Sequence, residues 1–276
     1  MLLKRVPLVQ NRKTSLMTLQ ETPTPNKITL QTLVEAGAHY GHQAAKWNPK
    51  MAPYIYGKRN KMHIIDMSKT MGSWERTEKF LTQAVLDGKQ FLFVGTKRQA
   101  APAIEKAAKD SDCMYVNHRW LGGLLTNFET IKQAIARLKD WENKLANDLT
   151  LTKKERGQIT KNIEKKLKTI GGIRELRVAK NIVLIISDIN QESLALQEAR
   201  CLGFPVVAIV DTNTNPELVD YPIPANDDAV KTIELILNSI SHLIQTVKSS
   251  RAPAISKDAD DATNTLMRQA IAEKGD

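Results

Sequence analysis

Short runs of β-branched and aromatic residues alternate with helical segments over most of the chain. The four clearest runs cover residues 90–96, 113–117, 181–188 and 205–211. The last two are almost continuously apolar, which is typical of parallel strands buried on both faces of a sheet. Helical segments cover residues 97–109, 191–202 and 226–247, the last after a short extended piece at 221–224. Alternating strands and helices predict an α/β fold, with a doubly wound parallel sheet and helices on both faces.

One stretch, residues 128–170, interrupts this alternation with two helical segments and no strand. Thr152 and Glu155 have the spacing of a capping box, which would begin the second helix. We therefore expect an inserted antiparallel α-helical hairpin over residues 129–170. Its apolar seam consists of Ile131, Ile135, Leu138, Trp141, Leu145, Ile159, Ile163, Leu167 and Ile170. Its basic side chains are Lys153, Lys154, Arg156, Lys161, Lys165, Lys166 and Lys168, which would form either an ordinary solvated face or an arm that contacts RNA or an acidic protein.

The two ends of the chain lack a sustained apolar pattern. Residues 1–27 are basic and rich in Thr, Pro and Asn, which indicates a flexible extension, although a transit peptide has a similar composition. Residues 251–276 contain an acidic cluster and indicate a flexible tail. Residues 28–128 and 171–250 then form the sheet domain.

Charge divides the chain into a basic and an acidic part. The formal net charge is +10, but residues 1–180 contribute +17 and residues 181–276 contribute −7. Such segregation favours a polyanionic partner for the first part, most often nucleic acid or an anionic membrane. Cys113 and Cys201 are not spaced as a disulfide framework or a thiolate zinc site, which favours a reducing compartment. Because no apolar run approaches about 20 residues, we expect no membrane span.

The segment Gly95-Thr96-Lys97-Arg98 lies where a strand leads into a helix, a position at which backbone N–H groups attract phosphate. It lacks the spacing of a phosphate loop, and the chain has no GxGxxG motif or GxSxG nucleophile elbow. Lys97 and Arg98 could instead hold an RNA phosphate. A nucleotide- or phosphate-binding enzyme or switch remains the alternative function at this point.

A resident metal has little support in the sequence. His39 and His42 form an H-x-x-H fragment without a nearby third ligand, so a structural or RNA-contacting role is preferred over zinc. Asp188 and Asp211 follow strands, and they could bind Mg²⁺ weakly where the carboxyl ends of the strands converge. The pair at Asp227-Asp228 fits the first turn of a helix. We expect no cofactor and no catalytic residue.

Two segments combine cations, aromatic rings and amides in the way that RNA-binding surfaces do. They cover residues 46–61 and 117–127. Lys and Arg neutralise phosphates, rings stack on bases, and amides reach base edges or the 2′-hydroxyl. The candidate RNA-binding residues are Lys46, Trp47, Asn48, Lys50, Lys58, Arg59, Asn60, Lys61, Lys97, Arg98, Asn117, His118, Arg119, Trp120 and Asn127.

With these segments in view, residues 28–251 resemble the second protein of the small ribosomal subunit, the S-two family of bacteria and organelles. The motifs that carry the resemblance are EAGAHYGH at 35–42, KWNPKM at 46–51, FVGTKR at 93–98, VNHRWLGG at 116–123, TN at 126–127, VDTN at 210–213 and IPANDDA at 223–229.

The resemblance implies a flavodoxin-like sheet domain with an inserted α-hairpin and no enzymatic activity. It also implies binding to ribosomal RNA on the solvent side of the small subunit, between head and body, near other subunit proteins and the messenger exit path. Asp220-Tyr-Pro and the following Ile223-Pro-Ala-Asn are most similar to plastid and cyanobacterial members. A plastid ribosome is therefore the expected location, with a cyanobacterial cytoplasm as the alternative.

Overall fold

A five-stranded parallel sheet forms the centre of the molecule. The structure, a computed structural model, describes residues 27–148, 152–176 and 180–250. The strands are β4 (Gln90–Val94), β5 (Met114–Val116), β6 (Ile182–Ile186), β7 (Val206–Val210) and β8 (Tyr221–Pro224), and their spatial order is β5-β4-β6-β7-β8. Taken in chain order this is 2-1-3-4-5, the flavodoxin-like order of doubly wound sheets. The predicted fold class is confirmed, and the short extended piece at 221–224 is the fifth strand.

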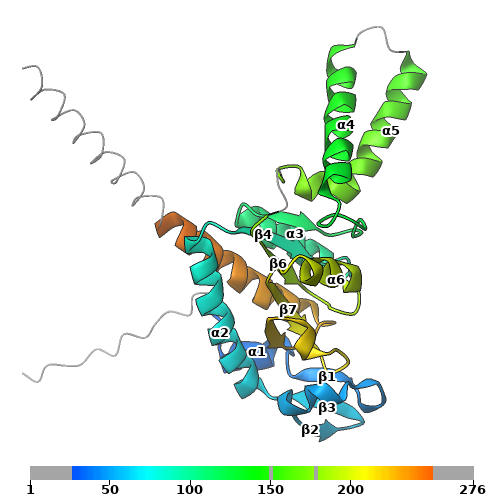
Figure 1. Cartoon of the computed structure of the whole chain (residues 1–276). Helices are drawn as coiled ribbons and strands as arrows, with labels where there is room; N and C mark the ends of the chain where they lie inside the picture. The colour runs from blue at the N-terminus through cyan, green and yellow to red at the C-terminus, as the bar shows by residue number, and fades with distance from the viewer. Residues whose placement is uncertain (1–26, 149–151, 177–179, 251–276) are drawn as a thin grey trace, which may run out of the picture.

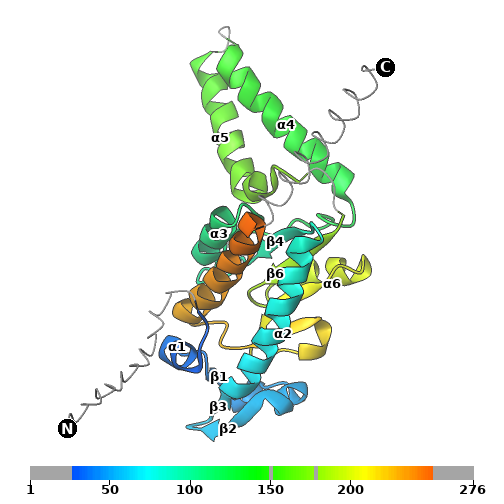
Figure 2. The same cartoon turned by 90° about the vertical axis from the view of Figure 1, so that its left-hand side faces the viewer.

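Helices cover both faces of this sheet. On one face α1 (Leu30–Ala36), α2 (Met67–Leu86), α3 (Ala101–Asp110) and the helix of residues 230–250 share a buried core, and on the other face lies α6 (Ser193–Cys201). Figures 1 and 2 show the two layers. Alternate strand residues serve the two cores: Phe93 and Ile185 face the first, whereas Leu92 and Ile186 face the second. Double burial explains why these strands read as continuous apolar runs.

A second, antiparallel sheet of three short strands was not predicted. It consists of β1 (Tyr40–Gln43), β2 (Ile55–Arg59) and β3 (Met62–Ile65), in the order β1-β3-β2, with short 3-10 helices at Ala44–Lys46 and Pro49–Tyr54 between β1 and β2. It lies against the loop after β7. A Cβ at Gly41 would lie 2.5 Å from Thr212 Cγ2, so the glycine permits this close approach.

Two further helices, α4 (Phe128–Asn147) and α5 (Lys153–Ile170), pack on each other and project from the sheet domain. They lie at the opposite end of the molecule from the small sheet (Figures 1 and 2). The predicted capping box at the start of α5 is confirmed, because the Glu155 N–H donates to Thr152 Oγ1 and the Thr152 N–H donates to Glu155 Oε2. Among the helices of the described residues, none combines the length and apolar character that a membrane span requires. The predicted extension and tail lie outside these residues.

Candidate nucleic-acid interface

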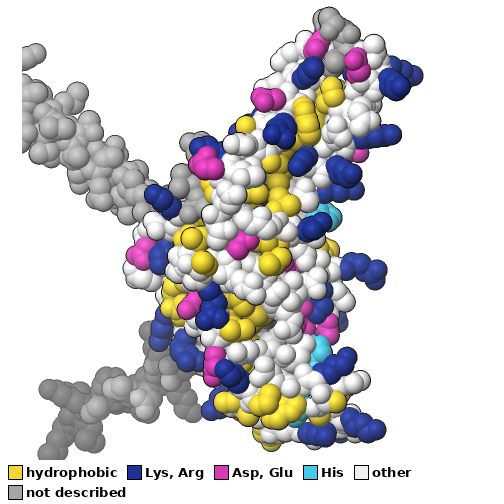
Figure 3. Space-filling view, turned by 45° about the vertical axis from the view of Figure 1, so that its right-hand side comes forward, with side chains coloured by type: hydrophobic (Ala, Val, Ile, Leu, Met, Phe, Trp, Pro, Cys, Tyr) yellow, Lys and Arg dark blue, Asp and Glu magenta, His cyan; other side chains and the backbone are white. Residues whose placement is uncertain are grey.

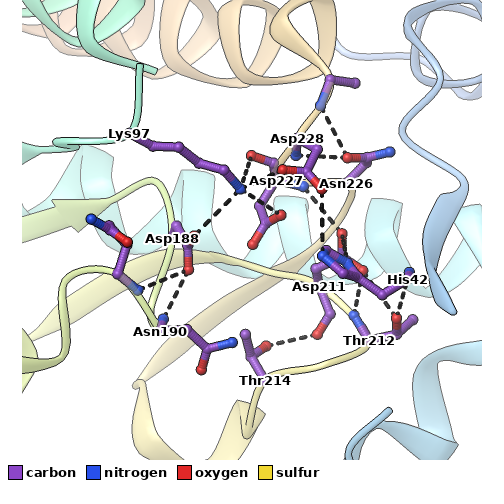
Figure 4. Close-up of polar contacts among 12 residues, drawn as sticks. His42, Lys97, Asp188, Asn190, Asp211, Thr212, Thr214, Asn226, Asp227 and Asp228 are labelled. Carbon is purple, nitrogen blue, oxygen red and sulfur yellow. Dashed lines mark hydrogen bonds and ion pairs between the residues drawn. The ribbon is translucent and has the colours of Figure 1, made fainter. Parts of the chain in front are cut away.

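The carboxyl ends of β4 and β6 flank the point where the sheet order reverses, which is where doubly wound folds bind ligands. Here the Lys97 ammonium fills that position. Its Nζ lies 2.6 Å from Asp228 Oδ1, 3.2 Å from Asp227 Oδ1 and 3.4 Å from Asp188 Oδ2 (Figure 4). Burial alone would lower the pKa of Lys97, but these carboxylates outweigh it and raise the pKa above its usual value. Lys97 is thus the internal counter-ion of three carboxylates, a role that the sequence did not suggest, and its RNA contact stays a prediction.

The backbone N–H of Thr96, next to Lys97, is also hydrogen-bonded to a carboxylate of the protein. Thr96 donates both its N–H and its hydroxyl to Glu192 Oε1, each at 2.6 Å. Glu192 is only 2% exposed. A Cβ at Gly95 would lie 2.5 Å from Ser187 Oγ, so the turn is packed against β6. The N–H group that would receive a phosphate already holds a carboxylate of the protein, which argues against the nucleotide-binding alternative. Arg98, at the rim, is exposed.

His42 connects the small sheet to this edge. Its Nδ1 lies 3.1 Å from Asp211 Oδ2, its Nε2 lies 3.4 Å from Asp228 Oδ2, and its backbone N–H donates to Thr212 Oγ1. His42, Asp211 and Asp227 each offer a ligand atom within 4.8 Å of the others, so these three could hold a metal ion. A set with an imidazole suits Zn²⁺ better than Mg²⁺, which prefers oxygen ligands. Sequence reasoning missed these three residues as a ligand set because His42 is far from Asp211 and Asp227 along the chain. The available signal was that both aspartates follow strand-like runs.

Replacing Asp227 by asparagine is expected to flatten the pH dependence of stability. Burial, then the nearby Asp188 and Asp211, raises the pKa of Asp227 from 3.8 to about 7. The folded state therefore retains a proton that the unfolded state releases near pH 4, and this contribution to stability is lost as pH rises towards 7. The Asp211 carboxylate, 3.1 Å from Nδ1, is the main cause that raises the pKa of His42, so His42 also contributes stability at low pH that is lost as pH rises.

Urea unfolding of the wild type and Asp227→Asn, measured from pH 4.5 to 8 in EDTA, checks this expectation. Asp110→Asn serves as a control because Asp110 is exposed and lies in α3, outside the cluster. An Asp227→Asn profile parallel to that of the wild type would contradict the assignment.

The second candidate segment, residues 117–127, is held by one carboxylate from α6. Glu198 accepts hydrogen bonds from the Trp120 indole N–H at 3.0 Å and from the backbone N–H groups of Gly123, Leu125 and Thr126 at 2.8, 3.0 and 3.3 Å. The Trp120 side chain is 6% exposed and packs in the core. Trp120 therefore anchors the loop, and the structure gives no support to its predicted stacking on RNA.

The other polar residues of this segment differ in accessibility. The Asn117 side-chain amide is half-buried and donates to Glu105 Oε2 at 2.9 Å. His118, Arg119 and Asn127 are exposed. The accessible groups of the loop are therefore those on either side of the Trp120 anchor.

The first candidate segment belongs to the small sheet. Asn48 caps the 3-10 helix by accepting from the Lys50 N–H, and Lys50 forms an ion pair with Glu217. Trp47 is 38% exposed, and its ring lies 5.0 Å from that of His63. Lys46 and four residues at the β2–β3 turn are exposed. The four are Lys58, Arg59, Asn60 and Lys61.

The β2–β3 turn has a fixed shape. Asn60 and Lys61 adopt φ values of +49° and +63°, as a type I′ hairpin turn requires. The turn thereby places three cations and an amide on one short protrusion. The 117–127 loop instead leads from the edge strand β5 into α4, so the structure does not join the two segments into one pocket.

These features define a class of protein. Its ligand crevice is closed by its own Lys97 and Glu192, and its accessible polar groups lie on protruding turns, as in a binding or scaffold protein. Comparison with known proteins gives the family: residues 33–246 match the model described as Ribosomal protein S2. The chain belongs to the ribosomal protein S2 family, and it is a structural ribosomal protein rather than an enzyme.

Relatives of two kinds are similar over most of their length. Small ribosomal subunit protein uS2 of Zymomonas mobilis is 43% identical, with 89% of this chain and 98% of the relative covered. Small ribosomal subunit protein uS2c of Phaeodactylum tricornutum is 48% identical, with 80% and 99% covered. The uS2c protein of Rhodomonas salina is 46% identical, with 85% and 96% covered. The resemblance noted in the sequence is therefore confirmed.

Proposed function

We propose that the chain is a constituent of the small ribosomal subunit that binds ribosomal RNA through exposed cations and amides of its two loops. The observation that carries this proposal is the β2–β3 turn, where Lys58, Arg59 and Lys61 are exposed on a fixed protrusion. Trp47 offers a partly exposed ring in the same small sheet. Cations that position phosphates, beside a ring and amides, form the contacts that RNA-binding proteins use.

The structure refines the set of residues in this proposal. The accessible members are Lys46, Trp47, Lys58, Arg59, Asn60, Lys61, Arg98, His118, Arg119 and Asn127. Asn48, Asn117 and Trp120 support the shape of the loops, and Lys50 has a partner in Glu217. Lys97 compensates the carboxylates of the sheet edge. Other proteins of the subunit are proposed as further neighbours.

Replacing Lys58, Arg59 and Lys61 together by alanine is expected to weaken binding to small-subunit ribosomal RNA. Each phosphate contact that is lost removes roughly one from the slope of log affinity against log salt concentration, so three lost contacts reduce the slope by about 3. Filter binding between 50 and 300 mM KCl measures it. An unchanged slope would remove the β2–β3 turn from the interface, and wild-type affinity independent of salt would overturn the RNA proposal as a whole.

We also propose a plastid ribosome as the location. The uS2c relatives and the 220–226 sequence support it, whereas uS2 relatives from bacteria are equally similar and support a bacterial cytoplasm. The weak cation site suggested near Asp188 and Asp211 is proposed in a narrower form, with Zn²⁺ favoured over Mg²⁺ by the imidazole of His42. Because Lys97 already compensates Asp188, a cation would bind on the side of Asp211, beside His42 and Asp227.

A further inference from the structure

A groove of about 490 Å³ lies between α2 and the helix of residues 230–250, on the face that Figure 2 turns towards the viewer. Its α2 wall consists of Met71, Trp74, Glu75, Glu78 and Thr82. Steps of three, one, three and four residues keep these positions on one side of the helix. At 1.5 Å per residue the wall is about 16 Å long, which is enough for a short peptide segment.

Much of the groove is apolar. Trp74 and Ile28 line it and are each 6% exposed. Met71, Leu243 and Val247 also line it, and they are only partly buried against the core. Because burial of apolar surface is favourable, the groove favours an occupant with apolar side chains.

Two carboxylates line the same groove. Glu75 and Glu78 are exposed, and with Lys27 at the rim the lining keeps one more negative than positive charge. Lys79 lies four residues after Glu75, but among residues 27–148, 152–176 and 180–250 neither glutamate forms an ion pair. A positively charged occupant would therefore complement the groove.

This charge argues against two kinds of occupant. The carboxylates would repel the phosphates of RNA. Lys and Arg side chains instead gather along an edge of the molecule that Figure 3 brings into view, from α4 and α5 towards the small sheet. A second copy related by a two-fold axis would bring the same glutamates face to face, so it does not fit the groove either.

The two terminal segments outside the described residues both adjoin the groove. Lys27, which follows residues 1–26, lines it, and so does Val247, three residues before the described part ends. Residues 251–276 contain four basic and five acidic residues, whereas residues 1–26 contain four basic residues and one acidic residue. Charge complementarity therefore selects residues 1–26.

One stretch of this segment, residues 12–19 (RKTSLMTL), joins two cations to three apolar side chains. Leu19 lies eight residues before Lys27, and an extended chain of that length spans up to about 28 Å, so the stretch can reach any part of the groove. Residues 2–9 (LLKRVPLV) have a similar composition but lie further from Lys27. The longer loop makes their docking less favourable.

We propose that residues 12–19 bind in the groove between α2 and the helix of residues 230–250. Their apolar side chains lie against its apolar wall, and their two cations lie beside Glu75 and Glu78. The N-terminal extension, which the sequence predicts to be flexible, is then held on the sheet domain over this short stretch. The inference goes beyond the proposed function, because the partner is a segment of the chain itself and RNA takes no part.

Photo-cross-linking of the purified full chain, without RNA, tests the proposal. The photoreactive residue p-benzoylphenylalanine replaces Leu16 in one variant and Leu8 in a matched variant. Irradiation is expected to link position 16 to peptides of α2 or of the helix of residues 230–250 about fivefold more often than position 8. A mixture of isotope-labelled and unlabelled chains shows whether each link lies within one chain.

Charge reversal tests the ionic part of the proposal. Glu75→Lys with Glu78→Lys is expected to reduce the link from position 16 about fivefold, and adding Arg12→Glu with Lys13→Glu is expected to restore it. The matched control is Glu129→Lys with Glu164→Lys, which changes the charge equally on α4 and α5 and should leave the yield unchanged. Circular dichroism establishes that each variant is folded, and Glu75→Gln with Glu78→Gln replaces the reversal if it unfolds the chain.

Links from position 16 that miss the groove would overturn the inference. So would a yield that the groove variants leave unchanged, or links mainly between differently labelled chains, which would assign the groove to a second copy. A stronger link from position 8 would overturn the choice of residues 12–19. Because RNA is absent, each of these failures leaves the proposed function standing, and a failure of RNA binding leaves this inference standing.

Discussion

Replacing Glu198 by glutamine is expected to lower the free energy of unfolding by about 3 kcal/mol, because hydrogen bonds to a charged acceptor contribute roughly 1.5–3 kcal/mol each. In the wild type one carboxylate receives the Trp120 indole N–H and three backbone N–H groups, in addition to the Thr126 hydroxyl. Glutamine retains one acceptor oxygen and turns an NH₂ group towards N–H donors. Some N–H donors are then left without an acceptor. The free-energy cost of leaving them unpaired exceeds the gain from no longer having to desolvate a charged carboxylate.

The pH dependence of the Glu198 effect has a definite sign. Burial would raise the pKa of Glu198, but the hydrogen bonds from Trp120 and the loop backbone outweigh it and hold the pKa below its usual value. A carboxyl group with a lowered pKa in the folded state stabilises it above the pKa of the unfolded state, and this contribution is lost as pH falls through the folded value. The difference between the wild type and Glu198→Gln should therefore be largest at neutral pH and shrink in acid.

Urea unfolding followed by tryptophan fluorescence measures both effects. Glu234→Gln is the matched control, because Glu234 is exposed on the helix of residues 230–250 and its removal should change stability little. Equal stability of the two variants at neutral pH would show that the carboxylate does not hold the loop.

Replacing Gly172 by alanine is expected to cost about 3 kcal/mol of stability, towards the upper end of the range for overpacked sites. A Cβ at this position would lie 2.3 Å from the Tyr115 carbonyl oxygen and 2.8 Å from the Tyr115 ring. The oxygen belongs to the backbone of β5, so it cannot move aside as the end of a flexible side chain could. The substitution would push the 3-10 helix Gly171–Ile173 at the base of α5 away from the sheet.

The adjacent glycine supplies the control for this prediction. At Gly171 a Cβ would meet only Leu167 Cδ2 at 3.9 Å, and the backbone φ of −58° suits alanine. Thermal unfolding should therefore separate Gly172→Ala from Gly171→Ala by several degrees. Similar melting temperatures for the two variants would refute the close packing of Gly172 on β5.

The parallel sheet was predictable from sequence, but the small sheet and α2 were not, for physical reasons. The β1, β2 and β3 strands are four or five residues long, and their pairing contains irregularities, so no alternating apolar pattern arises. The buried face of α2 includes hydroxyl residues such as Thr70 and Thr77, whose side chains donate to Pro224 O and Ser73 O. Their polarity conceals the helical period of the buried face.

The kinds of residue at the candidate interface could be predicted from the sequence, but the role of each residue could be predicted only in part. Exposed turn cations such as Lys58 and Arg59 follow from sequence, because a two-residue hairpin turn leaves its flanking side chains in solvent. The roles of Lys97 and Trp120 depend on Asp227, Asp228 and Glu198, which lie 78 or more residues away in sequence. Only the fold brings such partners together.

The contacts that shape the basic loops also set an order of events during synthesis. The backbone N–H of His42 in the small sheet donates to Thr212, 170 residues later, and the 117–127 loop is held by Glu198, more than 70 residues later. Domains form from the N-terminus as the chain emerges from the ribosome, and contacts distant in sequence form late. A nascent or truncated chain that ends before residue 198 has neither contact. The two loops therefore acquire their final shape only after Glu198 and Thr212 of the acidic second part have been synthesised.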